Sequence, residues 1–525
     1  MRRIWKIFGD IGIALLLFFI WTLAWGAAPP KVTPELMKEG EALFKKQCIV
    51  CHGAGGKGDG PAADFLFPKP RNFTTGTFKL RSTPSGSPPT DENLFGTITR
   101  GMPGSAMPSF AFLSERGRWA LLAFVKELAK MEKPEEVITV PQEPPMTAKS
   151  LAQGKELYIK MKCWQCHGFE GTGDGPSANQ LVDDEGFPIP PNDFTRGIFK
   201  GGGRSSDIYL RFTAGMDGTP MPSYEDTLND AQRWALAHYV ESLVGSKVVV
   251  QPSTGTIVAR KVPGRLPKDA LDPLWNKVPA TTIPLMHLWQ KKEAVDALSV
   301  KAVLNGREVA FLLEWEDWQI NSSFLRHQDF TDSAAIMLSL SPELPLSKQP
   351  HFTMGEKGQP VNIWYWRLDR QMDLAGLQDI ERVYPAMVSD DYQLETSRYP
   401  KDVEKPSHLP ITSAAAHDPV FITGWGSGNP LSVPMRPSAV EDLNAEGFGT
   451  LTAQPQDDQN VKGKGLYVAG RWKVVFTREL RSNGPFDVQL KSGGVFPIAF
   501  GIWDGSKGDR DGQKAVTTWF TLKLE

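Results

Sequence analysis

Cysteine is scarce in this chain, with only four among 525 residues. All four belong to two Cys-x-x-Cys pairs, Cys48/Cys51 and Cys163/Cys166, and each pair is followed directly by a histidine. No thiol is left for a disulfide framework or for an iron–sulfur cluster held by cysteines. Any cofactor beyond those that the two pairs serve must therefore be held by other side chains.

Excess charge of one sign is also missing. The net charge of −2 shows no basic surplus of the kind that binds nucleic acid. Charged residues make up 22% and hydrophobic residues 41%, close to the average for soluble globular proteins. This composition excludes wholesale disorder, a collagen and a membrane protein with many spans. At about 100–200 residues per domain, the length predicts three or four folded units.

The long uncharged hydrophobic run that stands out lies at the N-terminus, where residues 11–28 follow the basic residues Arg2, Arg3 and Lys6. A basic start followed by an apolar run is typical of an export signal. The 18 residues also reach the lower limit for crossing a bilayer. A cleaved signal peptide and a retained membrane anchor are both compatible with this segment, and Pro29 after the small residues favours the anchor. Either interpretation places the body of the protein in the periplasm.

An internal repeat surrounds the two cysteine pairs. The segment that begins CIVCHGAGGKGDGP at Cys48 matches the one that begins CWQCHGFEGTGDGP at Cys163, 115 residues later. The match continues through GMPGSAMPSF and GMDGTPMPSY to two segments that contain Arg-Trp-Ala. Apolar residues at helical spacing predict helices over 35–47 and 152–162 before the pairs, and helices over 115–129 and 230–244 that close each copy.

Cys-x-x-Cys-His is the attachment pattern of a c-type heme. Both thiols form thioethers with the heme vinyl groups, and the adjacent histidine on a short helix reaches the iron. A single match is also compatible with a zinc or redox site, but two copies inside a repeat favour heme c. The predicted covalent and proximal residues are Cys48, Cys51 and His52 for the first heme, and Cys163, Cys166 and His167 for the second.

The distal iron ligand is expected to be a methionine, because Met/His ligation is typical of electron-transfer cytochromes c. Each copy offers two, Met102 or Met107 and Met216 or Met221. The copies resemble class I cytochromes c, whose axial methionine often precedes proline, and the resemblance favours Met107 and Met221. Two filled axial positions favour outer-sphere electron transfer over peroxidase chemistry. Trp119 and Trp234 are interpreted as core residues.

The C-terminal half differs from the repeat in its sequence pattern, which favours β-strands. Short β-rich runs occupy 300–317, 471–480 and 495–505, and Asn305-Gly306 predicts a hairpin turn inside the first. Ten of the sixteen tryptophans lie beyond residue 270. We expect an antiparallel β-sandwich with long insertions.

The strings DPLWNKVPATTIPL, LLEWEDWQ, TMGEKGQPVNIW, IAFGIWDG and GQKAVTTW resemble the heme-binding family typified by the γ subunit of ethylbenzene dehydrogenase. The resemblance covers about residues 265–525, with an insertion around 395–440, and implies a b-type heme held by one methionine and one lysine. It points to Met354 and, with Lys473 and Lys507 as alternatives, to Lys514. Five histidines could instead supply an axial ligand: His287, His327, His351, His408 and His417.

The sequence therefore predicts a multidomain, non-catalytic electron-transfer subunit with two heme c and one heme b, in which all-α class I cytochrome c domains precede a mainly β sandwich. Relatives of the C-terminal domain serve type II molybdoenzymes of the DMSO reductase family. This resemblance implies an iron–sulfur and a catalytic subunit as partners, and a soluble cytochrome c or terminal oxidase on the other side. The alternative is a diheme cytochrome fused to a ligand- or carbohydrate-binding module, with tryptophans as stacking platforms. The predicted layout is signal peptide or membrane anchor 1–30, first cytochrome c domain 31–132, linker 133–148, second cytochrome c domain 149–248, linker 249–264 and heme b domain 265–525.

Overall fold

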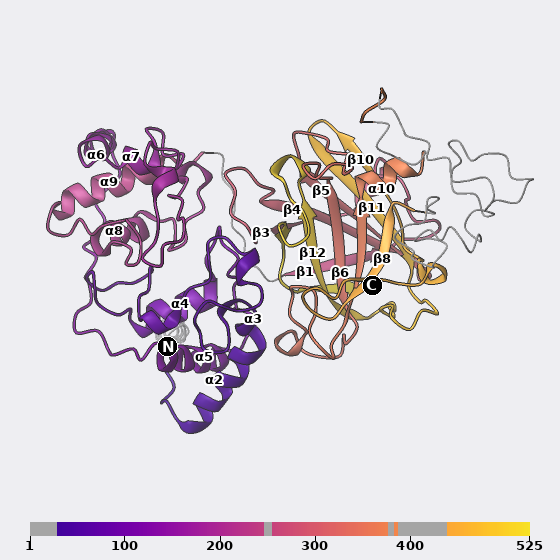
Figure 1. Cartoon of the computed structure of the whole chain (residues 1–525), viewed down its shortest axis with the longest axis horizontal. Coiled ribbons are helices and arrows are strands. Elements are labelled where there is room, and N and C mark those ends of the chain that lie inside the picture. The colour runs from indigo at the N-terminus through magenta and orange to yellow at the C-terminus, as the bar shows by residue number, and fades with distance from the viewer. Residues whose placement is uncertain (1–28, 246–254, 376–382, 387–437) are drawn as a thin grey trace, which may run out of the picture.

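The computed structural model describes residues 29–245, 255–375, 383–386 and 438–525. Helices fill the N-terminal part and strands fill the C-terminal part, and the two parts lie side by side (Figure 1). The predicted signal or anchor and most of the predicted insertion fall outside the described residues. Within the described ranges, the structure contains no helix that is both long enough and apolar enough to cross a bilayer.

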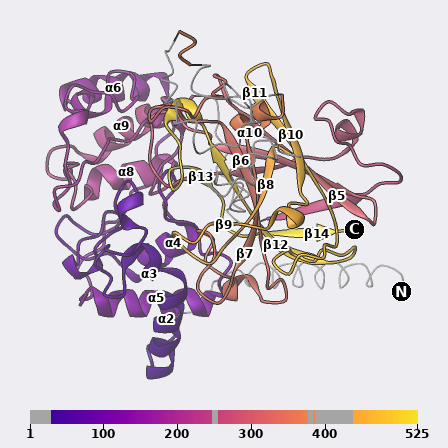
Figure 2. The same ribbon diagram turned by 45° about the vertical axis from the view of Figure 1, so that its right-hand side comes forward.

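The helical half consists of two copies of one arrangement, which we call module 1 and module 2 (Figure 2). Most helices begin at a capping side chain, for example that of Thr33, which accepts a hydrogen bond from the Leu36 amide. All four predicted helices are confirmed. Module 1 contains α2 (Pro34–Gln47), α3 (Ile49–His52), α4 (Asp91–Arg100) and α5 (Glu115–Leu128), and module 2 contains α6 (Ala148–Lys160), α7 (Trp164–His167), α8 (Ser205–Ala214) and α9 (Asp230–Ser242).

The first and last helices of each module cross at a glycine. A Cβ atom on Gly40 would lie 2.1 Å from the Ala120 carbonyl oxygen, and one on Gly154 would lie 2.0 Å from that of Ala235. Only glycine permits so close an approach of two helix backbones. The repeat therefore preserves the helix crossing as well as the cysteine pairs.

The segment between the modules runs along both of them. The Ile138 amide donates a 2.8 Å hydrogen bond to the Ser82 carbonyl of module 1, and Val140 packs against the hydrophobic core of module 2. His238 of module 2 lies 3.3 Å from Glu143. The predicted linker is thus bound to the surfaces that it joins.

The C-terminal half is one extensively hydrogen-bonded sheet that folds over itself into a sandwich. Its main path runs β10-β11-β5-β4-β1-β14-β12-β6-β7-β8-β9. The strands are β1 (Thr256–Lys261), β2 (Thr281–Pro284), β3 (Met286–His287), β4 (Ala297–Leu304), β5 (Glu308–Glu316), β6 (Ser333–Ser339), β7 (Val361–Arg367), β8 (Val440–Ala445), β9 (Thr452–Ala453), β10 (Lys462–Val468), β11 (Arg471–Glu479), β12 (Val495–Trp503), β13 (Ala515–Val516) and β14 (Phe520–Leu524), and a short helix α10 (Leu368–Asp373) follows β7.

The expectation of a purely antiparallel sandwich is wrong in one place. Strand β1 pairs in parallel with both β14 and β4. Strand β1 is the first strand of this half, and it lies inside the sheet between β14 and β4 and not at the sheet edge. The hairpin predicted at Asn305-Gly306 is confirmed, because Gly306 has a positive φ of 88° between β4 and β5.

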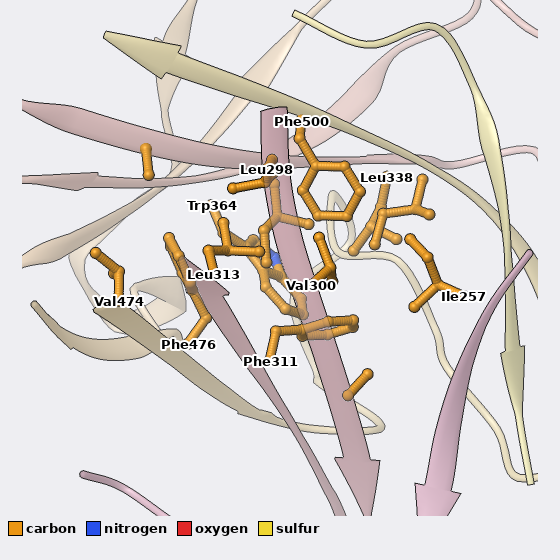
Figure 3. Packing of buried hydrophobic residues seen from close by; sticks show 14 of the residues in the cluster. Ile257, Leu298, Val300, Phe311, Leu313, Leu338, Trp364, Val474, Phe476 and Phe500 are labelled. Atoms are coloured by element: carbon orange, nitrogen blue, oxygen red, sulfur yellow. The ribbon is translucent and has the colours of Figure 1, made fainter. Parts of the chain in front are cut away.

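The two faces of the sheet carry separate hydrophobic clusters. Trp364 of β7 lies in the main core together with Phe311 and Phe476 (Figure 3). Trp366 of the same strand belongs to the same cluster. The alternate residues of the same strand, including Ile363, belong to a second cluster on the other face. This second cluster, which also contains Met354, we call the outer-face cluster.

Both modules contact the β half. Phe67 of module 1 exchanges backbone hydrogen bonds of 3.0 and 2.7 Å with Leu288 and Gln290. From module 2, Arg196 forms an ion pair with Asp296, whose carboxylate also lies 2.8 Å from Nε2 of His287.

Candidate heme sites

Module 1 encloses a cavity that contains every residue predicted for the first heme. Cys48, Cys51, His52, Met102 and Met107 all line it. Its volume is about 1400 Å³, counting space that is open to solvent. Phenylalanine and leucine side chains make up much of the remaining wall, which suits a large apolar ring.

His52, the predicted proximal histidine of module 1, has one ring nitrogen engaged by the backbone. Its Nδ1 lies 2.9 Å from the Arg71 carbonyl oxygen, so Nδ1 carries the proton and Nε2 is left free for a metal. The ring stacks on Phe73 with centroids 4.4 Å apart. Burial lowers the pKa of His52 to about 4, which keeps the imidazole neutral. Sequence reasoning did not identify Arg71 or Phe73, although Asn192 and Phe194 occupy the equivalent positions in the second copy of the repeat.

Module 2 repeats this geometry. Its cavity, of about 1300 Å³ with open space included, is lined by Cys163, Cys166 and His167. Nδ1 of His167 lies 3.0 Å from the Asn192 carbonyl oxygen, and the ring stacks on Phe194 at 4.4 Å. Burial likewise lowers the pKa of His167.

The four thiols are free and mostly enclosed. Burial raises the pKa of Cys48 and of Cys51 to about 12, and that of Cys163 to about 11. Such thiols are mostly protonated in the absence of a metal or heme. The apolar walls fit thioether attachment to a heme, which removes the need to ionise the sulfur.

Each distal loop brings two methionines to its cavity. The Met102 amide donates to the Met107 carbonyl at 3.1 Å, and Met216 donates to Met221 at 3.1 Å. All four line their cavities. Met107 and Met221 also pack against the hydrophobic clusters that contain Cys48 and Cys163 respectively.

The outer-face cluster of the β half provides a flat apolar floor. Ala335 of β6 and Ala499 of β12 are buried there, and Gly501 lies next to them along β12. A Cβ atom on Gly501 would lie 3.3 Å from the Trp503 ring and 3.7 Å from Cδ of Lys514, so these two side chains cover the sheet at that point.

Met354 lies at this floor in a strained conformation. Its φ is +81°, which is uncommon for a residue with a side chain. The Gly447 amide donates a 2.9 Å hydrogen bond to its carbonyl oxygen, and its side chain packs against the outer-face cluster. Backbone strain of this kind concentrates at functional sites.

Lys514 reaches the same face from the C-terminal strands. Its Nζ lies 5.0 Å from the Trp503 ring centroid and donates 2.8 Å to the Asp511 carbonyl. The side chain keeps some solvent exposure, yet protein atoms crowd the amine and this burial lowers the pKa of Lys514 to about 8. The other candidates are engaged elsewhere, since Lys473 pairs with Glu314 at 2.5 Å and Lys507 with Glu293 at 2.6 Å.

A cavity of about 1180 Å³, open space included, adjoins this face. It is lined by Tyr365, Trp503 and Asp511, and by the guanidinium-bearing residues Arg326, Arg367 and Arg510. Neither Met354 nor Lys514 lines it. Protein groups already engage these arginines, because Arg326 pairs with Asp329 and Arg367 with Asp369, both at 2.8 Å.

The histidines that were alternatives to Lys514 have other contacts. His287 faces Asp296, and Nδ1 of His351 lies 2.6 Å from the Thr353 hydroxyl. His327 lines the arginine-rich cavity. His408 and His417 lie outside the described residues.

Two residues from the β half line the module 1 cavity, and the sequence did not predict this contact. They are His351 and Phe352, just before Met354 in the chain, and their rings stack with centroids 4.6 Å apart. His351 is only 3% exposed. No local motif marks them, because they reach the cavity only through the docking of the two halves.

The tryptophans predicted to pack in the core do so, since Trp119 and Trp234 are both buried. In the described part of the C-terminal half, most tryptophans are buried and Trp318, at 84% exposed, stands alone as a largely exposed one. The described residues therefore do not form a carbohydrate-binding surface with several exposed tryptophans.

The fold and these cavities define a c-type cytochrome with an attached β domain. Residues 37–129 and 151–244 match the cytochrome c family model, and residues 272–515 match the ethylbenzene dehydrogenase family model. The chain therefore belongs, in these two parts, to the cytochrome c and ethylbenzene dehydrogenase families, and it is a heme protein of electron transfer.

Three curated relatives agree with this assignment. A respiratory nitrate reductase heme subunit of Haloferax mediterranei is 22% identical over 48% of this chain and 67% of its own length. The chlorate reductase γ subunit of Ideonella dechloratans is 23% identical over 49% and 80%. The dimethylsulfide dehydrogenase γ subunit of Rhodovulum sulfidophilum is 24% identical over 55% and 89%.

Among solved structures, the chain is similar to one from a Kuenenia stuttgartiensis reducing HAO-like protein complex. The identity is 47%, the match covers 41% of this chain and 99% of that one, and the TM-score is 0.40.

Proposed function

We propose that this protein is a three-heme electron relay. Two c hemes are attached at Cys48/Cys51 and Cys163/Cys166, with His52/Met107 and His167/Met221 on the two irons. One b heme lies on the outer-face cluster between Met354 and Lys514. Each heme supplies a one-electron couple, and the chain supplies the axial ligands, the apolar walls and the spacing.

The relay runs from the b heme through the module 1 heme to the module 2 heme. The observation that carries this order is the wall of the module 1 cavity, which includes His351 and Phe352 from the β half and Lys200 from module 2. Phe352 is two residues from Met354, so the module 1 heme faces the b heme. The module 2 cavity shares Lys79, Leu80 and Lys200 with module 1.

We place the relay in the periplasm, anchored by the N-terminal segment or released from it, as the basic and apolar start of the sequence predicts. The b heme exchanges electrons with the iron–sulfur subunit of a molybdoenzyme or a similar redox complex, and the module 2 heme with a soluble cytochrome c or a terminal oxidase. Support comes from relatives described as heme or γ subunits of nitrate reductase, chlorate reductase and dimethylsulfide dehydrogenase.

The axial groups determine what the chain does chemically. A neutral imidazole from His52 or His167 and a thioether from Met107 or Met221 would hold each c-heme iron, which would leave no open position for oxygen or peroxide. A lysine side chain can bind iron only through its unprotonated, neutral amine. The burial that lowers the pKa of Lys514 to about 8 favours this neutral form.

The cofactor content is tested by a pyridine hemochrome assay on the purified protein. The expected result is b-type and c-type heme in a ratio of one to two. Heme c alone would contradict the three-heme proposal and favour a ligand-binding C-terminal module.

The axial methionines are tested one module at a time. Met107→Ala and Met221→Ala should each remove the near-infrared methionine–iron band of one c heme while the thioethers retain that heme. If neither variant changes the band, Met102 and Met216 are the ligands instead.

A further inference from the structure

The two c-heme cavities meet at a seam whose residues neither heme motif includes. Lys79, Leu80 and Lys200 line both cavities. Lys79 and Lys200 occupy equivalent places in the repeat, in Thr-Phe-Lys and Ile-Phe-Lys. The modules are therefore joined through the same side of each cavity.

The seam is held together by two arginines that are not repeated. Arg81 is fully buried; its Nη2 lies 2.7 Å from the Asp217 carboxylate and donates 2.5 Å to the Ala214 carbonyl. Arg211 donates 2.6 Å to the Arg81 carbonyl. Asp217, the acid that neutralises Arg81, also accepts from the Ser85 hydroxyl and the Gly86 amide.

The remaining positive charge at the seam lacks a partner. Nη1 of Arg81 and both Nε and Nη1 of Arg211 are buried without a hydrogen-bond acceptor. In the described part of the chain, no acidic side chain lies within ion-pair distance of Lys79, Lys200 or Arg211. A buried charge without a partner is costly, so such an arrangement implies an anion.

Electrostatics agrees with this geometry. Burial, with repulsion from Arg71 and Lys200, lowers the pKa of Lys79 to about 8, and burial lowers that of Lys200 to about 8. Burial together with Arg81 lowers the pKa of Arg211 to about 10. Attraction from Asp183 and Asp184 at Lys79, and from Asp207 at Arg211, offsets only part of this lowering of the pKa values.

We propose that Lys79 and Lys200, which line both cavities, and Arg211, which lines the module 2 cavity, bind the propionates of the c hemes, so that the two hemes share counter-charges. Arg81, which lines neither cavity, holds the seam behind them. This inference rests on the proposed function, because it requires a heme in each cavity. Propionates lie on the half of the porphyrin opposite the thioethers, and guanidinium and ammonium groups bind carboxylates strongly. The diheme unit is then electrostatically coupled, and a charge lost from the seam affects both irons.

The test is a spectroelectrochemical titration of the c-heme α band in the full-length holoprotein. Lys79→Gln and Lys200→Gln each remove one seam cation, and we expect both c-heme components to shift to lower potential in each variant. A positive charge near the heme disfavours the ferric state, so its removal favours oxidation. A tenfold change in the reduction equilibrium corresponds to about 59 mV for one electron. Lys57→Gln and Lys155→Gln, exposed lysines that line neither cavity, should leave both components unchanged.

Each outcome decides something different. A shift confined to the heme of the mutated module would overturn sharing, and unchanged potentials with two c hemes still bound would overturn propionate binding at the seam. A pyridine hemochrome assay on the same samples separates these results from failure of the proposed function. An absence of covalent heme in the wild-type protein would overturn both proposals.

Discussion

The helical half and the β half differ in how their candidate heme ligands are arranged. In each cytochrome module, two cysteines and a histidine within five consecutive residues are the candidates for the attachment and one axial ligand. In the β half, the candidates Met354 and Lys514 come from positions 160 residues apart, and Met354 packs against a cluster made by a third set of residues. A covalent local site tolerates changes around it, whereas a site assembled from distant segments depends on the whole fold.

The difference is also visible in where charge is buried. At the seam between the modules, guanidinium nitrogens of Arg81 and Arg211 are buried without a hydrogen-bond acceptor. In the β half, the carboxylates of Asp317, Asp332 and Asp504 all lie within 4.8 Å of one another, and all three residues are buried. The two halves should therefore respond differently to mutation and to pH.

The largest expected effect comes from removing one covalent site. Replacing Cys48 and Cys51 together by serine should remove the module 1 heme, and replacing Cys163 and Cys166 should remove the module 2 heme. Heme staining after denaturing electrophoresis should fall by half in each case, because only the thioethers survive denaturation. Equal staining to the wild type in either variant would show that the pair in question carries no heme.

The second prediction tests the assembled site. Met354→Ala and Lys514→Ala should each lower the b-heme content or shift the b-heme absorption bands, while the c-heme bands stay unchanged. A pyridine hemochrome assay and visible spectra measure both. Lys473→Ala is the matched control, because that amine is bound to Glu314 on a strand remote from the outer-face cluster in the sheet order. An unchanged b heme in Lys514→Ala would move the ligand to Lys507 or to a histidine.

The third prediction concerns pH and the β half. Burial raises the pKa of Asp317 to about 7 and, with the charge of Asp317, that of Asp332 to about 8. The folded state therefore binds more protons than the unfolded state between about pH 4 and pH 8, and stability is lost as the pH rises through this window. Each proton of difference contributes about 1.4 kcal/mol per pH unit.

Calorimetry between pH 5 and pH 8 measures this slope, with a chelator present because clustered carboxylates bind divalent cations. The transition assigned to the β half should fall in temperature as the pH rises, and Asp317→Asn should flatten the slope. A transition temperature independent of pH in the wild type would contradict the assignment.

The smallest effect is expected at the ion pair between the modules. Asp217→Asn leaves the guanidinium of Arg81 buried beside a neutral partner, which should cost about 1–3 kcal/mol of stability in the helical half. Asp64→Asn removes an exposed ion pair with Lys69 and should cost less than about 1 kcal/mol. Equal shifts in the calorimetric transition of the two variants would show that the seam does not join the modules.

The contrast between the halves also explains what could be predicted from sequence. The cysteine pairs, the histidines and the helices around them are read from short-range spacing, and the repeat doubles each signal. The hairpin at Asn305-Gly306 is local in the same way. The parallel pairing of β1 with β14 and β4 is not a local feature. Nothing in residues 256–261 indicates which strands pair with β1 or in which direction.

The residues that connect the sites were beyond sequence reasoning for the same physical reason. His351 and Phe352 belong to the wall of the module 1 cavity only because two domains dock. Arg81 and Asp217 pair across modules, at positions where the repeat has glycine and proline instead. Contacts between domains leave no periodic trace in either partner, so only the assembled structure reveals them.

The central proposal is that electrons pass between the b heme and the module 2 heme through module 1. Its most direct test is stopped-flow oxidation of the reduced protein by a protein-sized acceptor, with the b-heme α band followed in the two double-serine variants. We expect the b heme to deliver its electron to the remaining c heme in the variant without the module 2 heme, and to stay reduced in the variant without the module 1 heme. Oxidation of the b heme at the wild-type rate in the absence of the module 1 heme would contradict the relay.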